Sequence, residues 1–112
     1  MKFWRSDTME LKSIGKMIEI EGDITKILIH KDYLPGLVGI QDLAKIMIIY
    51  WDSEPEGKPF YEEKGIFATS YTERPNPIGV EVVELSSVED NLLIVVGLHA
   101  HINDNIIDIK PV

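Results

Sequence analysis

Hydrophobic and polar residues alternate along much of this chain with a period of two, the pattern of a half-buried β-strand. The segments with this pattern, rich in Ile, Val and Leu, are residues 11–21, 24–30, 45–51, 65–69, 78–88, 92–98 and 106–109. The segment 45–51 is apolar almost throughout, which is typical of a strand buried on both faces, or nearly so. We therefore predict about seven short strands.

Turn signals separate these segments. Gly22-Asp23 predicts a tight hairpin between the first two strands, and residues 89–91 predict another, with Asn91 suited to a left-handed conformation. Residues 34–36 interrupt the strand pattern, and the apolar side chains of residues 37–43 then recur at three-residue intervals. This spacing predicts one or two helical turns that cap an end of the core.

The succession of strands predicts an all-β fold, specifically a small closed antiparallel β-barrel of about seven strands with one short helix. Closure of the barrel would remove exposed strand edges. The 112 residues suit a single domain spanning 1–112, of which 1–11 form a short N-terminal extension. No apolar leader and no run of about 18 apolar residues is present, so we expect a cytoplasmic protein without a membrane partner.

Composition removes several classes of function. The chain has no cysteine, which excludes disulfides, cysteine-based zinc sites and thiol nucleophiles. No Gly-x-Gly-x-x-Gly or P-loop pattern occurs, so a nucleotide would not bind in the Rossmann manner. The formal net charge of −8 disfavours sequence-independent nucleic-acid binding, and we expect no DNA partner. Five lysines in the first half could still form a local basic patch for RNA: Lys12, Lys16, Lys26, Lys31 and Lys45.

The strongest local motif is Arg74-Pro75-Asn76-Pro77-Ile78-Gly79. Each proline fixes its own φ and keeps the residue before it out of the helical region, so the segment is stiff. It displays the Arg74 guanidinium and the Asn76 amide, while Gly79 permits a ligand or another chain to approach the backbone. Preorganised polar groups lose little entropy on binding, which favours a binding site. The alternative is a stiff loop in which Arg74 pairs with a nearby acid.

A second polar run follows residue 98. His99 and His101 share a strand face and could bind a metal, but a third ligand with convincing spacing is absent, so we predict no metal. Asn103-Asp104-Asn105 predicts a tight turn. Asp108 and Lys110 share a strand face, which predicts an ion pair that contributes little to stability.

Together these motifs resemble a known family. Residues 65–69, the block 74–80, residues 82–85 and Asp108-Ile109-Lys110-Pro111 follow the order and spacing of the TsaA-like (TrmO-like) domain, and the resemblance covers about residues 14–111. It implies a small β-barrel, often a homodimer, that binds S-adenosylmethionine near the subunit interface. It also implies a tRNA partner, because characterised members methylate N6 of the threonylcarbamoyl-modified adenosine in the anticodon loop.

The resemblance implies residue roles as well. The residues expected to bind the cofactor are Arg74, Asn76, Gly79, Val80, Asn103, Asp104 and Asn105. Asp108 and Lys110 are expected to bind substrate, and Tyr71 or His99 to relay a proton.

Two other functions remain open. Ser70-Tyr71-Thr72 stands where the family has Arg-Ser-Pro, so a cofactor-facing arginine is absent. This departure and the acidic charge fit a non-catalytic binding module on the same barrel. They also fit an S-adenosylmethionine-dependent enzyme that acts on a small molecule instead of RNA.

Overall fold

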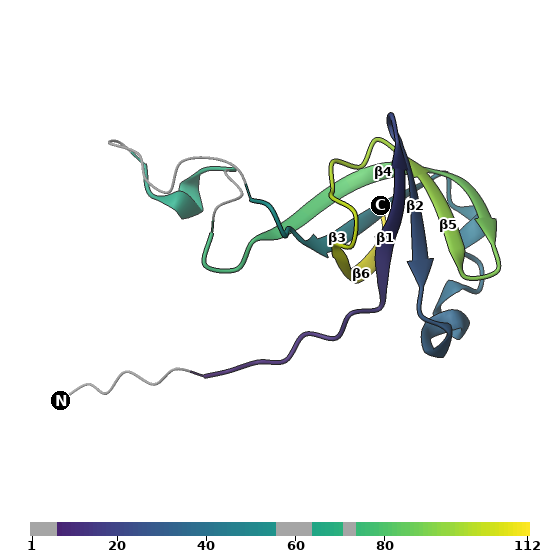
Figure 1. Ribbon diagram of the computed structural model, residues 1–112, viewed down its shortest axis with the longest axis horizontal. Coiled ribbons are helices and arrows are strands. Elements are labelled where there is room, and N and C mark those ends of the chain that lie inside the picture. Colours follow the sequence, from purple (N-terminus) through teal and green to yellow (C-terminus); the bar gives the residue numbers. More distant parts are fainter. Residues whose placement is uncertain (1–6, 56–63, 71–73) are drawn as a thin grey trace.

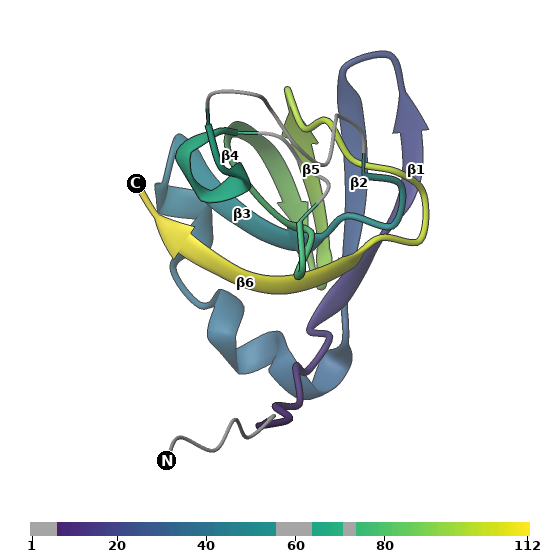
Figure 2. The same cartoon turned by 90° about the vertical axis from the view of Figure 1, so that its left-hand side faces the viewer.

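A closed barrel of six antiparallel strands forms the body of the protein (Figures 1 and 2). The computed structural model describes residues 7–55, 64–70 and 74–112. The strands, in the order β1-β2-β5-β4-β3-β6 around the barrel, are β1 (Gly15–Glu21), β2 (Ile24–Ile29), β3 (Lys45–Trp51), β4 (Ile78–Glu89), β5 (Leu92–Val96) and β6 (Asn105–Pro111). The predicted all-β barrel is confirmed, with six strands in place of about seven.

Along each strand, alternate side chains point into the barrel and form its core. The interior is made almost entirely of aliphatic side chains: Met17, Ile27, Ile29, Ile46, Ile48, Val83, Leu93, Val95 and Ile106 are each at most 2% exposed. The burial of β3 also alternates, because Met47 and Ile49 are only half-buried on the outside of the barrel. The strand is thus fully buried on its inner face and partly buried on its outer face, close to the predicted burial on both faces or nearly so.

Residues 65–69 do not form the predicted strand. Ile66–Ala68 is a 3-10 helix, η3, held by backbone bonds from Ala68 to Gly65 and from Thr69 to Ile66. Six strands already close the barrel and leave no free edge for a seventh. Figure 1 shows η3 beyond the barrel, on the side from which β4 enters it.

Helical turns after β2 cap one end of the core, as predicted (Figure 2). They are two 3-10 helices, η1 (Lys31–Leu37) and η2 (Ile40–Asp42), and they bury Leu37 and Ile40. The 3-10 structure therefore begins six residues before the predicted start at residue 37 and is interrupted at Gly39, whose φ is 86°.

Both predicted hairpins are present, at residues 22–23 and 90–91. In the second, the left-handed residue is Asp90 (φ 55°), not Asn91. The Asn91 side-chain amide instead donates to the Ile29 carbonyl at 2.7 Å and so covers the end of β2. No helix among the described residues is long and apolar enough to cross a bilayer.

Candidate functional site

A cleft of about 960 Å³ lies where the end of β3, the start of β4 and the chain after β5 meet. Its lining combines three carboxylates, one guanidinium and two imidazoles with a few apolar side chains. The lining residues are Tyr50, Asp52, Glu54, Thr69, Ser70, Arg74, Ile78, Gly79, Val80, Glu81, His99, Ala100 and His101. Four of the residues predicted from the sequence, Arg74, Gly79, Val80 and His99, therefore meet at this cleft.

A hydrogen-bonded group of three residues forms one wall. The Tyr50 hydroxyl lies 2.6 Å from Oε2 of Glu81 and 2.9 Å from the His99 carbonyl oxygen, and it can donate its proton to either. Nδ1 of His99 lies 2.8 Å from the other Glu81 oxygen, Oε1. The His99 ring is largely exposed, at 89%, whereas the Glu81 side chain is 22% exposed. Glu81 thus orients His99 from β4, and Tyr50 orients Glu81 from β3.

Gly79 makes this arrangement possible. It is paired with Tyr50 in the register of β3 and β4, and the tyrosine ring packs against its backbone. A Cβ at position 79 would lie 2.6 Å from Cε1 and 2.7 Å from Oη of that ring. The sequence predicted that Gly79 allows a close approach, and the group that approaches it here is a side chain of the same barrel.

The environment of Tyr50 fixes its protonation state. Burial, followed by the hydrogen bond to Glu81, raises the pKa of Tyr50 well above its usual value. The hydroxyl therefore stays protonated near neutral pH and acts as a hydrogen-bond donor.

Arg74 also lines the cleft. Its Nη1 donates to the Thr69 carbonyl at 2.9 Å, and its guanidinium lies over the Phe67 ring, 5.9 Å from the centroid. These contacts tie the stiff proline segment to η3. Asn76, by contrast, is exposed and does not line the cleft; its carbonyl accepts a hydrogen bond from Ile78 N at 2.8 Å.

The predicted turn at Asn103-Asp104-Asn105 lies behind the cleft instead of in its lining. Asn103 adopts φ 73° at the turn itself, and Asn105 begins β6, where its Oδ1 accepts from Ser13 Oγ at 2.8 Å. Asp104 is buried at 1% exposure.

The two residues predicted to bind substrate lie elsewhere. Asp108 and Lys110 line a second groove of about 510 Å³ between η1, η2 and β6. Their Oδ2 and Nζ atoms are 3.9 Å apart, so the predicted ion pair is present. Tyr71 lies outside the described residues.

An apolar strip adjoins the cleft on the outside of the barrel. Ile78, Val80 and Val82 of β4 are 40%, 56% and 49% exposed, and β3 places Ile49 beside Val80 and Met47 beside Val82. Ile78 and Val80 belong to the strip and to the cleft lining alike. The cleft therefore opens beside an uncovered apolar surface.

Several cleft residues carried no recognisable sequence signal. Tyr50 stands inside an apolar run that ends at Trp51 and is interpreted from the sequence as a core residue. Glu81 and Asp52 are two of 19 acids scattered along the chain. Gly79 could be recognised in the sequence, and its strand pairing with Tyr50 is what brings Tyr50 to the cleft.

The fold and the cleft define a class: a small closed antiparallel barrel with a cleft lined by charged residues. The sequence model described as "tRNA-methyltransferase O N-terminal domain" matches residues 11–112, and the chain belongs to this family. The resemblance inferred from the Arg74-to-Val80 block is thereby confirmed.

Similar proteins and solved structures are consistent with this family assignment. The chain is 38% identical over 96 residues to a protein of Archaeoglobus fulgidus called "S-adenosyl-L-methionine-binding protein", with 78% of this chain and 68% of that protein covered. It is 32% identical to a "Probable S-adenosyl-L-methionine-binding protein" of Methanocaldococcus jannaschii, with 89% of each covered. The crystal structure of TrmO from Pseudomonas aeruginosa superposes with a TM-score of 0.77 at 21% identity, which shows the fold. The alignment covers 95% of this chain but 56% of that one.

Proposed function

We propose that this protein is an S-adenosylmethionine-dependent methyltransferase whose methyl donor binds in the cleft beside Tyr50 and Arg74. The family assignment and the names of the relatives support this proposal. The observation that carries it is the charge pattern of the cleft, in which Asp52, Glu54 and Glu81 line the same space as the Arg74 guanidinium.

The residues present fit this donor. When bound, S-adenosylmethionine supplies a methyl group on a cationic sulfur, next to an amino group and a carboxylate. The Glu81 carboxylate would hold the cationic part, and the Arg74 guanidinium would hold the donor's own carboxylate in a charge-assisted hydrogen bond. Ile78 and Val80 offer an apolar surface to the nucleoside. The volume of about 960 Å³ is at the upper end of the roughly 300–1,000 Å³ typical of ligand pockets.

In this proposal His99 would accept the proton that an attacking amine loses. A neutral ring that donates from Nδ1 to Glu81 Oε1, 2.8 Å away, leaves Nε2 as an acceptor on the exposed side of the ring. This is the arrangement of a general base with a carboxylate that orients it. The Tyr50 hydroxyl stays protonated and serves only to hold Glu81.

The family description names a tRNA methyltransferase, which supports tRNA as the acceptor. We propose, from the resemblance noted in the sequence, that the acceptor atom is N6 of the threonylcarbamoyl-modified adenosine in the anticodon loop. We further propose a homodimer packed through the apolar strip of Ile78, Val80 and Val82, because an exposed apolar surface of this kind marks an interaction site. A second subunit there would adjoin the cleft and enlarge the surface offered to RNA.

A methyl-transfer assay tests the acceptor. Labelled S-adenosylmethionine is supplied with tRNA that carries the threonylcarbamoyl modification, and with the same tRNA lacking it. Label in the modified tRNA alone supports the proposal, and His99→Gln should slow the transfer about 10²-fold or more while donor binding is retained. Binding of the donor without transfer to either tRNA would refute the RNA acceptor. The net charge of −8 would then favour a small-molecule acceptor.

A further inference from the structure

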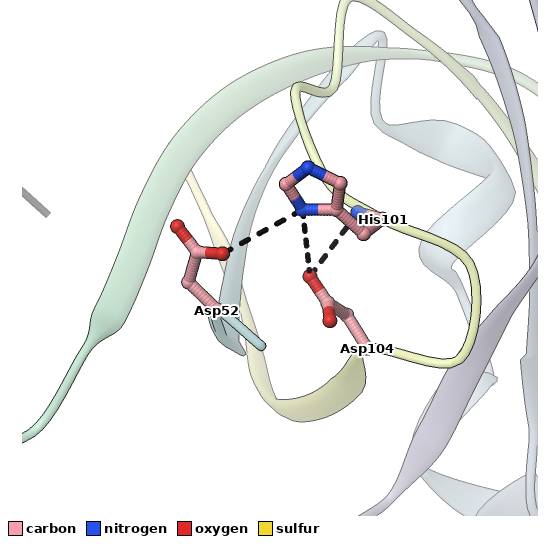
Figure 3. A group of neighbouring side chains, drawn as sticks. All are labelled: Asp52, His101 and Asp104. Atoms are coloured by element: carbon pink, nitrogen blue, oxygen red, sulfur yellow. Dashed lines mark hydrogen bonds and ion pairs between the residues drawn. The ribbon is translucent and has the colours of Figure 1, made fainter. Parts of the chain in front are cut away.

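We propose that Asp52, His101 and Asp104 bind a divalent transition-metal cation at the edge of the cleft. Figure 3 shows the two carboxylates converging on one side of the imidazole ring. One ligand atom from each residue lies within 4.8 Å of the other two. This proposal does not depend on the identity of the methyl donor or acceptor.

The distances fit shared coordination better than direct hydrogen bonding. Nδ1 of His101 is 3.6 Å from Oδ1 of Asp52 and 3.8 Å from Oδ2 of Asp104, which is too long for a hydrogen bond to either carboxylate. Two atoms bound to one tetrahedral zinc at about 2.0–2.2 Å lie roughly 3.4 Å apart. The ligand atoms of the three residues all lie within 4.8 Å of one another, so an inward movement of the carboxylates would bring them into one coordination shell.

The nitrogen that faces the carboxylates has no other partner. Nδ1 of His101 is buried and makes no hydrogen bond among the residues that the structure describes. A buried polar atom left unpaired is unfavourable, and two buried carboxylates on one side of it are also unfavourable without a cation. The exposures of the Asp52 and Asp104 side chains are 9% and 0%. A divalent cation would satisfy the nitrogen and compensate both charges.

Hydrogen bonds already orient the carboxylates. Asp104 Oδ1 accepts from the backbone N of Ser53 at 3.1 Å and from Ser53 Oγ, and Asp104 Oδ2 accepts from His101 N at 3.1 Å. Asp52 Oδ1 accepts from the backbone N of Glu54 at 3.0 Å. Such outer contacts are typical of ligating carboxylates, because they fix the oxygen that faces the metal.

The second nitrogen of the His101 imidazole also faces a carboxylate. Nε2 of His101 lies 3.4 Å from Oε2 of Glu54. Metal-bound histidines commonly donate from their second nitrogen to a carboxylate, which fixes the tautomer. Asp52 and His101 also line the cleft, so three protein ligands would leave a coordination position accessible from it.

The donor set indicates the class of metal. One imidazole nitrogen with two carboxylates suits zinc(II), manganese(II) or iron(II), whereas magnesium and calcium prefer oxygen alone. The sequence prediction considered His99 and His101 as a pair and, without a third ligand, expected no metal. In the structure His99 pairs with Glu81 instead, and the two ligands that join His101 are Asp52, which follows β3, and Asp104.

The test uses tag-free, chelator-treated protein titrated with zinc(II), and separately with manganese(II), by calorimetry. We expect one equivalent to bind to the wild type, and binding weakened about tenfold or more in Asp52→Asn and in His101→Gln. His99→Gln is the matched control, two residues away in the same segment, and should bind within twofold of wild type. Cobalt(II) should give visible absorption bands in the wild type that His101→Gln loses.

Circular dichroism shows whether each variant is folded. If Asp52→Asn fails to fold, His101→Gln decides the question, because the His101 ring is partly exposed and its replacement should be tolerated. Absence of stoichiometric binding by the wild type would overturn the proposal and leave His101 as an ion-paired imidazole. Binding that survives His101→Gln unchanged would also overturn it.

Discussion

The contact between Gly79 and Tyr50 makes the sharpest prediction about stability. Gly79→Ala would place a methyl carbon 2.6 Å from Cε1 and 2.7 Å from Oη of the Tyr50 ring. The ring cannot simply move aside, because Tyr50 is 4% exposed and its hydroxyl lies within hydrogen-bonding distance of Glu81 and the His99 carbonyl. Overpacking of this kind destabilises a core by about 1–3 kcal/mol.

Urea unfolding followed by far-ultraviolet circular dichroism measures this effect. A thermal melt gives a second measure, because in a domain of 112 residues each kcal/mol lowers the melting temperature by about 4 °C. Gly36→Ala is the control, because a Cβ there meets no atom within 4 Å, and it should change the free energy of unfolding by at most about 0.5 kcal/mol.

A double-mutant cycle tests the cause. Tyr50→Leu removes the ring, so adding Gly79→Ala in that background should cost little, which corresponds to a coupling free energy of about 1 kcal/mol or more. If Gly79→Ala is as stable as wild type, or if the two changes are additive, the reasoning about this contact is wrong.

Three further predictions concern other parts of the barrel. Because the pKa of Tyr50 is raised, the folded protein keeps the hydroxyl proton at pH values where the unfolded chain loses it. The free energy of unfolding should therefore fall as the pH rises above about 10, and Tyr50→Phe should make this fall smaller in unfolding curves measured at several pH values. Ser53→Ala removes a donor to the buried Asp104 carboxylate and should lower the free energy of unfolding by about 1–3 kcal/mol in urea titrations; no change would show that the bond contributes nothing. Val82→Lys should convert the proposed dimer to a monomer in light scattering with the fold intact, whereas a monomeric wild type would contradict the proposed dimer.

The hairpins were predictable because they depend on local turn signals such as Gly22-Asp23, and the succession of short strands predicted an all-β barrel. The period of two did not show which face lies inside, because Ile78, Val80 and Val82 share the outer face of β4 and are exposed. The strand predicted at 65–69 was wrong because the same short apolar run suits a strand or a 3-10 turn. Whether such a run forms a strand depends on whether a neighbouring strand has an unpaired edge, and the local sequence does not show this.

The site was predictable only in part, for a similar reason. Arg74 and Gly79 stand in a proline-stiffened motif that is visible in the sequence, and both line the cleft. Tyr50, Glu81 and Asp52 reach the cleft through the register of β3 with β4, which depends on contacts distant in sequence. Asp108 and Lys110 belong to the same family motifs but lie in another groove, because β6 carries them past the opposite end of the core.

Calorimetric titration with S-adenosylmethionine tests the central claim most directly. The wild type should bind the donor. Arg74→Ala should weaken binding about tenfold or more, because it removes a charge-assisted contact of about 1.5–3 kcal/mol. Lys31→Ala, which removes the same charge outside the cleft, should leave the affinity unchanged. Absence of binding by the wild type at millimolar donor, or equal affinities in all three proteins, would contradict the assignment of this cleft as the donor site.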